Sequence, residues 1–297
     1  MKKKQMGSSA LLLLTAFIWG LAFVAQSQGM EYVGPFTFNG ARTLLAAAIL
    51  LPVGLARRRR TVRRGSRPYA ARTQAVGGVL CGVLLFAASS LQQIAMQTTT
   101  AGKAGFLTAL YIVLVPVLGV FWHKRVAPAV WAAVALATAG LYLLCGAGGA
   151  LAVGDWLLVA CALCFAGQIL LVDRFAPVTE PFLLSGTQFL VCGLLSVPCM
   201  LLWEAPTLAA LAAAAVPLAY AGVLSSAVGY TLQIIGQRDT PPTVASLLMS
   251  LESVFSAVAG AWILHERLSA AERGGCLLVF AAVVLAQLPA PRGRKNA

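Results

Sequence analysis

The sequence predicts an all-α integral membrane protein in which ten transmembrane helices form two inverted five-helix repeats around a central cavity. Three observations lead to this fold class: the composition, an internal duplication and the distribution of basic residues. Of the 297 residues, 60% are hydrophobic and only 10% are charged, and the mean hydropathy is +0.85. A soluble globule of this size needs more polar surface, so we expect the chain to lie in a bilayer.

Long apolar runs recur along the whole chain. An α-helix of about 20 apolar residues crosses the roughly 30 Å of hydrocarbon in a bilayer. In the third run, the small residues of Gly78-x-x-x-Gly82 indicate a face on which another helix packs closely. In chain order the ten expected spans are residues 8–29, 36–56, 73–96, 100–122, 128–146, 154–174, 181–203, 213–236, 241–264 and 270–289.

The chain contains an internal duplication. Residues 11–55 align without a gap on residues 157–201, so that Pro35-Phe36 meets Pro181-Phe182. Later, residues 98–144 align on residues 240–286. This second alignment superposes two similar motifs, His123-Lys124-Arg125-Val126 and His265-Glu266-Arg267-Leu268.

We therefore expect two homologous repeats, residues 8–146 and residues 154–289. Each repeat carries five crossings, and five is an odd number, so the second copy must enter the membrane from the opposite side. Two inverted halves of this kind enclose a site near the middle of the bilayer.

The basic residues lie mostly on one side of the expected topology. With a cytoplasmic N-terminus and ten crossings, 18 of the 22 Lys and Arg residues are cytoplasmic, and only Lys103, Arg267 and Arg273 are outside. Arg42 falls within a span. Such a bias is the positive-inside signature of membrane proteins. It places the chain in the inner cell membrane with both termini in the cytoplasm.

The densest basic segment is the expected cytoplasmic loop of residues 57–72. It contains eight arginines and one aromatic residue, Tyr69. An arginine-rich loop of this kind sets topology, and it attracts anionic lipid headgroups. We expect no nucleic-acid partner, because the loop lacks the aromatic pattern and the fold motifs of such sites.

The N-terminus has a second interpretation. Lys2-Lys3-Lys4 followed by an apolar run resembles a secretory signal peptide. The first span, however, has an internal counterpart at residues 157–175, which a cleaved signal would not need. We therefore interpret residues 8–29 as a transmembrane helix.

No cofactor or metal site is expected. Cys161-x-x-Cys164 has the spacing of a metal or redox pair, but it lies inside an apolar span without a second pair or a nearby histidine. Small buried hydrophobic residues are the better interpretation. The sequence also has no phosphate-binding loop of the Walker type, so direct use of ATP is not expected.

Three stretches are similar to those of a known family. They are Trp19-Gly20 in the first span, residues 98–117 in the fourth, and residues 245–254 followed by the motif at His265. In order and duplication they resemble the drug/metabolite transporter (DMT) superfamily, EamA type, over residues 10–289. The resemblance implies a ten-helix bundle whose cavity is lined by spans 1, 3, 4, 6, 8 and 9. It also implies transport of small metabolites, often outward.

Two positions depart from the family pattern. Ser253 stands where the family commonly has a proline after the carboxylate of the ninth span, whereas the fourth span keeps Pro116. The family's acidic residue after the ninth span is present as Glu266, but its first-half counterpart is Lys124. The sequence therefore leaves open whether the ninth span can bend.

Glu252 is the most informative polar residue within the spans. It lies near the middle of the ninth span, about 16 Å from either end at 1.5 Å per residue. A carboxylate at this depth costs roughly 2.5 to 3.5 kcal/mol, and no basic residue is expected at the same depth. We expect Glu252 to be protonated, hydrogen-bonded between helices or exposed to a wet cavity. It is a candidate for proton coupling or substrate binding, or a purely structural hydrogen-bonding group.

Two basic residues near the outer surface receive simpler interpretations. Arg42 lies shallow enough in the second span to extend toward the interface near Glu31, and a role in binding anions is the alternative. Lys103, at the start of the fourth span, is expected to be a charge at the rim.

Polar and aromatic side chains at membrane depth predict a cavity for a small solute. Hydroxyl and amide groups recur in both halves, and such groups both donate and accept hydrogen bonds. Bonds between helices are the alternative role for each. The candidate substrate-binding residues are Trp19, Gln92, Tyr111, Gln168, Ser225, Tyr230, Gln233, Ser250 and Glu252.

These features favour a secondary active transporter that exports a small metabolite, such as an amino-acid-like or other small polar or aromatic solute, by alternating access. An intramembrane lipid-modifying enzyme is the first alternative, but it would need a catalytic set at membrane depth, and His123 and His265 sit at helix ends. A scaffold that does not transport is the second alternative. The oligomeric state is left open.

Overall fold

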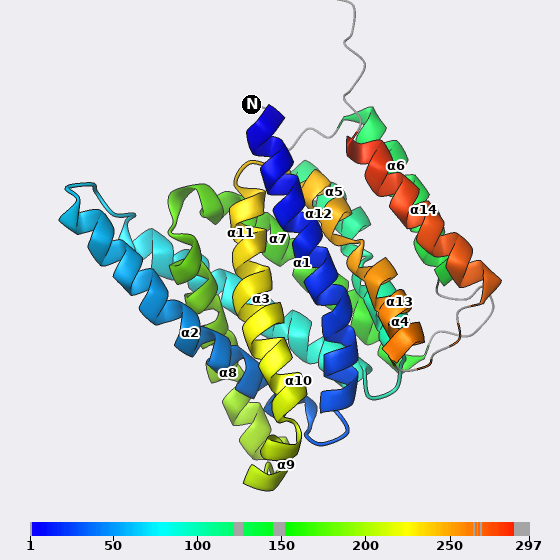
Figure 1. Cartoon of the computed structure of the whole chain (residues 1–297), viewed down its shortest axis with the longest axis horizontal. Coiled ribbons are helices and arrows are strands. Elements are labelled where there is room, and N and C mark those ends of the chain that lie inside the picture. Colours follow the sequence, from blue (N-terminus) through cyan, green and yellow to red (C-terminus); the bar gives the residue numbers. More distant parts are fainter. Residues whose placement is uncertain are drawn as a thin grey trace, which may run out of the picture.

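The computed structural model describes residues 2–121, 127–144, 152–263, 265, 267 and 269–287, and all regular structure in these ranges is helical (Figure 1). η1 is a short 3-10 helix and η2 is a π-helix. In chain order the elements are α1 (Lys2–Gly29), α2 (Pro35–Arg63), α3 (Ala71–Ala95), α4 (Ala101–Thr108), α5 (Tyr111–Phe121), α6 (Pro128–Leu144), α7 (Val153–Phe175), η1 (Ala176–Val178), α8 (Pro181–Trp203), α9 (Leu208–Ala213), α10 (Ala215–Ala219), η2 (Tyr220–Gly229), α11 (Tyr230–Gln237), α12 (Pro242–Met249), α13 (Glu252–Ile263) and α14 (Ala270–Gln287).

The multi-pass membrane fold is confirmed. Within the described ranges, eight helical segments are long and apolar enough to cross a bilayer, and they correspond to the first four and the sixth to ninth expected spans. α6 and α14 occupy the places of the fifth and tenth spans, and they pack side by side at one edge of the bundle (Figure 1). The count of ten crossings stays a prediction.

The contacts between helices follow the duplication. α1 packs on α11, η2, α12 and α13, and its repeat equivalent α7 packs on α3, α4 and α5. α2 packs on its own equivalent α8, and α6 packs on α14. When each helix is replaced by its equivalent in the other repeat, the contacts of α1 become those of α7, as expected for two copies of one unit. Each half therefore buries its apolar faces mainly against the other half.

The fourth and ninth spans are present as expected, but each is divided into two helices by a short turn. The fourth span is interrupted between Thr108 and Tyr111, and the ninth between Met249 and Glu252. The two interruptions occupy equivalent positions in the repeats. Interrupted helices near the middle of the membrane leave backbone groups available for a solute or ion.

Serine side chains explain the interruption of the ninth span, where no proline is present. Ser246, Ser250, Ser253 and Ser256 each donate a hydrogen bond to the backbone carbonyl three residues earlier, at 2.7 to 2.9 Å. Such bonds compete with the regular helical pattern and bend helices. At the interruption, Ser253 N bonds to Ser250 O at 3.0 Å, a tightened turn. The regular helix is thus interrupted in the second half although the family's usual proline is absent.

Two further segments differ from expectation. α2 continues to Arg63, so the first half of the expected loop of residues 57–72 is a helical extension. The eighth span contains the π-helix η2 over Tyr220–Gly229 rather than a regular α-helix. π-helical turns are rare and occur frequently at functional sites. Here the Ser225 carbonyl accepts a bond from Trp19 Nε1 at 3.1 Å.

The predicted small-residue face of α3 packs against α8. A methyl group added at Gly82 would lie 2.7 Å from the Gln188 carbonyl oxygen and from Val191 Cβ, closer than atoms approach without movement. We expect Gly82→Ala to destabilise the protein by about 1–3 kcal/mol, the usual cost of overpacking. Thermal unfolding of the purified protein in detergent measures this.

Gly274→Ala is the matched control, because Gly274 also lies within a helix but has no neighbour within 4 Å of the added carbon. We expect its unfolding midpoint to equal or slightly exceed that of the wild type, because alanine favours a helix more than glycine does. Equal midpoints for both variants would contradict the close packing of α3 on α8.

Candidate functional site

A cavity lies inside the bundle between the two halves. It holds about 460 Å³ of space not occupied by atoms, although little of this space is wide enough for a water-sized sphere. α1, α2, α3, α4, α5, α7, η2, α11 and α13 contribute to its wall. The lining residues are Trp19, Ala22, Phe23, Gln26, Arg42, Gln92, Thr108, Tyr111, Phe165, Gln168, Ile169, Ser225, Tyr230, Gln233 and Glu252.

Eight of the nine candidate residues line this one cavity, and Ser250 does not. Ser250 is fully buried, and its hydroxyl group donates to the Leu247 carbonyl oxygen at 2.8 Å. It belongs to the interruption between α12 and α13, so it shapes the backbone next to Glu252 rather than the cavity wall. The structure places the other eight together without showing that they bind a solute.

Glu252 is the first residue of α13, directly after the interruption. It is 4% exposed and lines the cavity. The Tyr111 hydroxyl group, from the equivalent interruption in the first half, interacts electrostatically with its carboxylate. That hydroxyl group nevertheless lacks a hydrogen-bond partner of ordinary geometry among the described residues.

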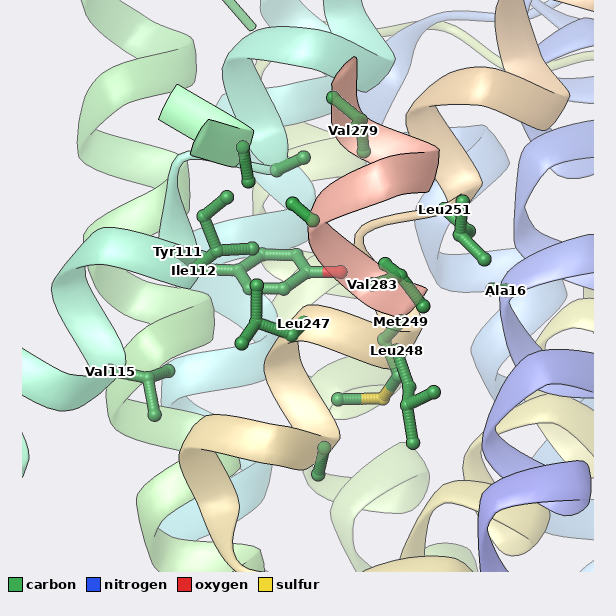
Figure 2. Packing of buried hydrophobic residues seen from close by; sticks show 14 of the residues in the cluster. Ala16, Tyr111, Ile112, Val115, Leu247, Leu248, Met249, Leu251, Val279 and Val283 are labelled. Atoms are coloured by element: carbon green, nitrogen blue, oxygen red, sulfur yellow. The ribbon is translucent and has the colours of Figure 1, made fainter. Parts of the chain in front are cut away.

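Tyr111 reaches this position from the start of α5. Figure 2 shows its ring extending away from the α5 backbone, near Leu247 and Leu248 at the end of α12. These side chains belong to one large apolar cluster that packs α5 and α12 together. The two interrupted spans are therefore in direct contact beside Glu252.

The expectation that Arg42 extends to the interface was wrong. Its side chain is buried, 7% exposed, and lines the cavity. Its Nε and Nη2 atoms donate to Asn39 Oδ1 at 3.2 and 3.1 Å, and Asn39 Nδ2 donates in turn to Ser196 Oγ at 3.2 Å. Asn39 lies one turn before Arg42, so it holds the guanidinium group against its own helix and away from the surface.

The cavity thus contains one basic and one acidic side chain. Within the described part of the chain, no ion pair involves Arg42 or Glu252. Tyr230 lines the same cavity as both side chains. A buried charge without a partner is costly, so a solute group of complementary charge would stabilise the ionised form of either side chain.

Aromatic rings form one wall of the cavity. The Trp19 and Tyr230 rings are tilted, with centroids 4.6 Å apart, and Phe189 packs edge-on against Tyr230 at 5.1 Å. Phe165 of α7 adds a further ring to the lining. The Trp19–Ser225 bond fixes the indole group on η2. This wall can contact the apolar part of a solute.

Amide side chains connect the second-half helices around the cavity. Gln233 Nε2 donates to Gln168 Oε1 at 3.2 Å, and Gln168 Nε2 donates to Gln188 Oε1 at 3.3 Å, which joins α11, α7 and α8. In the first half, Gln92 Nε2 donates to Thr108 Oγ1 at 3.1 Å. The bonds between helices that the sequence left as an alternative are therefore present.

Some hydrogen-bonding capacity remains unused. Gln26 Oε1, Gln233 Oε1 and the Tyr111 hydroxyl group are buried in lining residues and have no partner among the described residues. Buried polar groups are normally bonded, so these atoms are candidates for contacts with water or solute. They can provide one hydroxyl donor and two amide acceptors.

Sequence reasoning missed several lining residues. Gln26 lies seven residues after Trp19, and Phe165 lies three residues before Gln168, spacings that place both pairs on common helix faces. Those spacings were available in the sequence. Nothing in the sequence alone directs Arg42 inward, because its orientation depends on Asn39 and the contact with α8.

One ion pair and one set of hydrogen bonds join the halves at the end expected to face outward. Lys103, expected to be a charge at the rim, pairs with Asp155 across 2.8 Å, and the Asp155 side chain is only 2% exposed. Glu204 accepts hydrogen bonds from the backbone N–H groups of Phe36 and Thr37 at 2.8 and 2.7 Å. It caps α2 from beyond the end of α8.

The remaining residues singled out in the sequence are two cysteines, two histidines and the residues that follow the histidines. Cys161 and Cys164 are free thiols, and no group of three or more His, Cys, Asp or Glu residues in the described ranges could hold a metal ion. His265 lies just beyond α13 in a left-handed conformation, φ 57°. His123, Lys124 and Glu266 lie outside the described residues.

The fold and the cavity define a multi-pass α-helical membrane protein with a cavity between its two halves, the architecture of a membrane transporter. The sequence matches the EamA-like transporter family over residues 7–146 and again over residues 152–288. The chain belongs to this family, as the resemblance implied.

Relatives and a solved structure agree with this assignment. An uncharacterized transporter of Archaeoglobus fulgidus is 27% identical over 93% of this chain and 84% of its own length. The uncharacterized transporter YwfM of Bacillus subtilis is 26% identical over 97% of this chain and 96% of its own. A crystal structure with 22% identity superposes with a TM-score of 0.74, covering 95% of this chain and 98% of the other. That last likeness concerns the fold.

Proposed function

We propose that the protein is a secondary active transporter that exports a small zwitterionic, amino-acid-like metabolite across the cytoplasmic membrane by alternating access. One observation carries the choice of solute. Arg42 and Glu252 line the same cavity, and neither has an ion-pair partner in the described part of the chain.

A zwitterion complements this arrangement. Arg42 would bind the solute carboxylate through charge-assisted hydrogen bonds, while the Glu252 carboxylate, next to Tyr111, would accept bonds from the ammonium group. The apolar part of the solute would lie against Trp19 and Phe165. An anion or a cation alone would leave one of the two buried charges without a partner, which is costly.

Alternating access is supported by the narrow cavity and the interrupted spans. A solute larger than a few water molecules cannot enter without movement of helices, because little of the space admits a water-sized sphere. Equivalent interruptions stand beside the cavity in both halves, before Tyr111 and before Glu252. Bending at one and then at the other would open the cavity to each side in turn.

Glu252 is also our candidate for coupling to protons. A carboxyl group that meets a solute at membrane depth can exchange a proton for it. We favour the cytoplasmic-membrane topology given by the positive-inside bias, with both termini inside and anionic headgroups near residues 57–72. A lipid-modifying enzyme is less well supported, because the family and its named relatives are transporters.

The test is transport by the purified full-length chain in liposomes. We expect movement of radiolabelled neutral amino acids, but not of the matching carboxylic acids or amines, in the presence of a pH gradient. Protein-free liposomes are the control for leakage. Failure to move any amino acid, nucleobase or sugar phosphate in either orientation would contradict the proposed function and favour an enzyme or a scaffold.

A further inference from the structure

A second set of hollows lies away from the central cavity, where α2 ends beside the start of α8. Their empty volumes are about 760 and 600 Å³, and much more of this space admits water-sized spheres than in the central cavity. The two share Thr61, Tyr69 and Glu180. One is lined also by Arg57, Arg60, Arg64, Pro181 and Arg238, and the other by Arg58, Arg67, Pro68, Gln74 and Leu183.

The lining carries a large excess of positive charge. Six arginines contribute, and Glu180 is the one carboxylate among the lining residues. Glu180 is already engaged: Oε1 pairs with Arg57 Nε at 3.0 Å, and Oε2 accepts the Leu183 backbone N–H group at 2.8 Å. Arg60 and Arg64 on one side, and Arg58 and Arg67 on the other, have no acidic partner in the lining.

Two of the arginines are held in fixed positions. The Arg238 guanidinium group donates from Nε to the Ala176 carbonyl oxygen at 2.7 Å and from Nη2 to the Thr179 carbonyl oxygen, and it lies over the Tyr69 ring at 6.0 Å. Arg57 lies over the Phe182 ring at 4.9 Å. These contacts preorganise a cationic frame that spans both halves of the protein.

The face of α2 that leads to the hollow is apolar and exposed. Ile49 and Val53, 38% and 41% exposed, precede Arg57, Arg60 and Arg64 at steps of four and three residues. Residues at these spacings lie on one helix face. This face therefore changes from exposed apolar side chains to arginines at the end expected to face the cytoplasm.

The occupant that fits such a face is an amphiphile with an anionic head. Its acyl chains would lie along Ile49 and Val53, and its phosphate would reach the arginines. Arginine binds phosphate oxygens in bidentate geometry, and anionic lipids are enriched in the cytoplasmic leaflet. A soluble phosphate compound would use the arginines but gain nothing from the apolar face.

We propose that this hollow binds the phosphate-bearing headgroup of an anionic phospholipid of the cytoplasmic leaflet. The bound headgroup bridges α2 of the first half to α8 and α11 of the second. It therefore stabilises the conformation in which the halves are closed together at this end. This site is separate from the solute cavity, so the inference does not depend on the identity of the transported solute.

The experiment compares lipids and variants in the full-length protein. Thermal unfolding is measured in phosphatidylcholine nanodiscs with and without phosphatidylglycerol, and retained lipid is counted by native mass spectrometry. We expect phosphatidylglycerol to raise the thermal unfolding midpoint of the wild-type protein. We also expect it to remain bound to the protein in native mass spectrometry. The double variant Arg60→Gln/Arg64→Gln should bind it at least about tenfold more weakly, from two lost charge-assisted bonds.

Arg59→Gln/Arg63→Gln is the matched control, since it removes equal charge at the same spacing from residues that line neither hollow. It should keep the affinity of the wild type. All four arginines are exposed, so both variants should have the midpoint of the wild type in phosphatidylcholine alone. An equal loss in the two pairs would overturn the proposal in favour of diffuse surface attraction.

A third arm distinguishes lipid from soluble phosphate. Sodium pyrophosphate is added to the protein in phosphatidylcholine nanodiscs, and we expect much less stabilisation than phosphatidylglycerol gives. Equal stabilisation by pyrophosphate would overturn the assignment to a lipid headgroup, as would the absence of any effect of phosphatidylglycerol.

Discussion

Replacing Arg42 with glutamine is expected to lower transport of a zwitterionic amino acid by about 10- to 100-fold at solute concentrations below saturation. The guanidinium group lines the cavity, with Asn39 Oδ1 as its only side-chain hydrogen-bond acceptor among the described residues. It is therefore the group that can receive a solute carboxylate. Hydrogen bonds to charged groups contribute about 1.5–3 kcal/mol, which corresponds to this loss.

The measurement is initial uptake into liposomes over a range of solute concentrations. Arg72→Gln is the control, because Arg72 is exposed and lies outside the cavity and the hollows near residues 57–72. The variant should also lose its preference for amino acids over the matching amines, which lack the carboxylate. Unchanged uptake and an unchanged preference would exclude Arg42 as the carboxylate ligand.

Replacing Glu252 with glutamine is expected to have an effect of similar size. The variant keeps the shape and the proximity to Tyr111 but removes the negative charge that would hold the ammonium group. We expect uptake of amino acids to fall by about 10- to 100-fold, while the matching carboxylic acids are discriminated against less strongly. Glu31→Gln, at an exposed position in the turn after α1, is the matched control.

The same variant tests proton coupling separately from binding. Transport by the wild type should respond to an imposed pH gradient, whereas residual transport by Glu252→Gln should not. If Glu252→Gln binds the amino acid more weakly but its transport still responds to the pH gradient, Glu252 acts in substrate binding and not in proton coupling. Unchanged rates together with an unchanged pH dependence would exclude both roles and leave Glu252 as a structural group.

The two variants are informative together because their effects on specificity are opposite. Loss of Arg42 should favour solutes without a carboxylate, and loss of Glu252 should favour solutes without an amine. A protein that is merely unfolded would lose all transport and would show no change in preference. The comparison thus separates recognition from stability.

The fourth and ninth spans are both interrupted, but different residues lie at the two interruptions. In the ninth span, hydroxyl groups of four serines bond to carbonyls three residues earlier and tighten the chain before Glu252. The fourth span has no such series, yet it is interrupted at the equivalent position before Tyr111. Two different local sequences thus interrupt the helices at nearly the same place in the two repeats.

Much of the fold followed from the sequence alone. Composition and the length of the apolar runs require helices in a bilayer, because backbone polar groups must be satisfied within each span. The resemblance to the family rested on Trp19-Gly20 and on residues 98–117 and 245–254, in their order and duplication. Polar residues at membrane depth pointed to a cavity. Eight of the nine candidates do surround one space, since a polar side chain among apolar spans has few other places to lie.

The tertiary structure alone decided the chemistry of that space. Arg42 turns inward because Asn39, Ser196 and Cys192 form a polar contact between α2 and α8, a neighbourhood that spans more than 150 residues of chain. The pairing of Lys103 with Asp155 and the capping of α2 by Glu204 likewise depend on helices that are far apart in the sequence and meet only in the fold. Periodicity reports which face of a helix is polar, but the partner of a charge depends on which helices pack together.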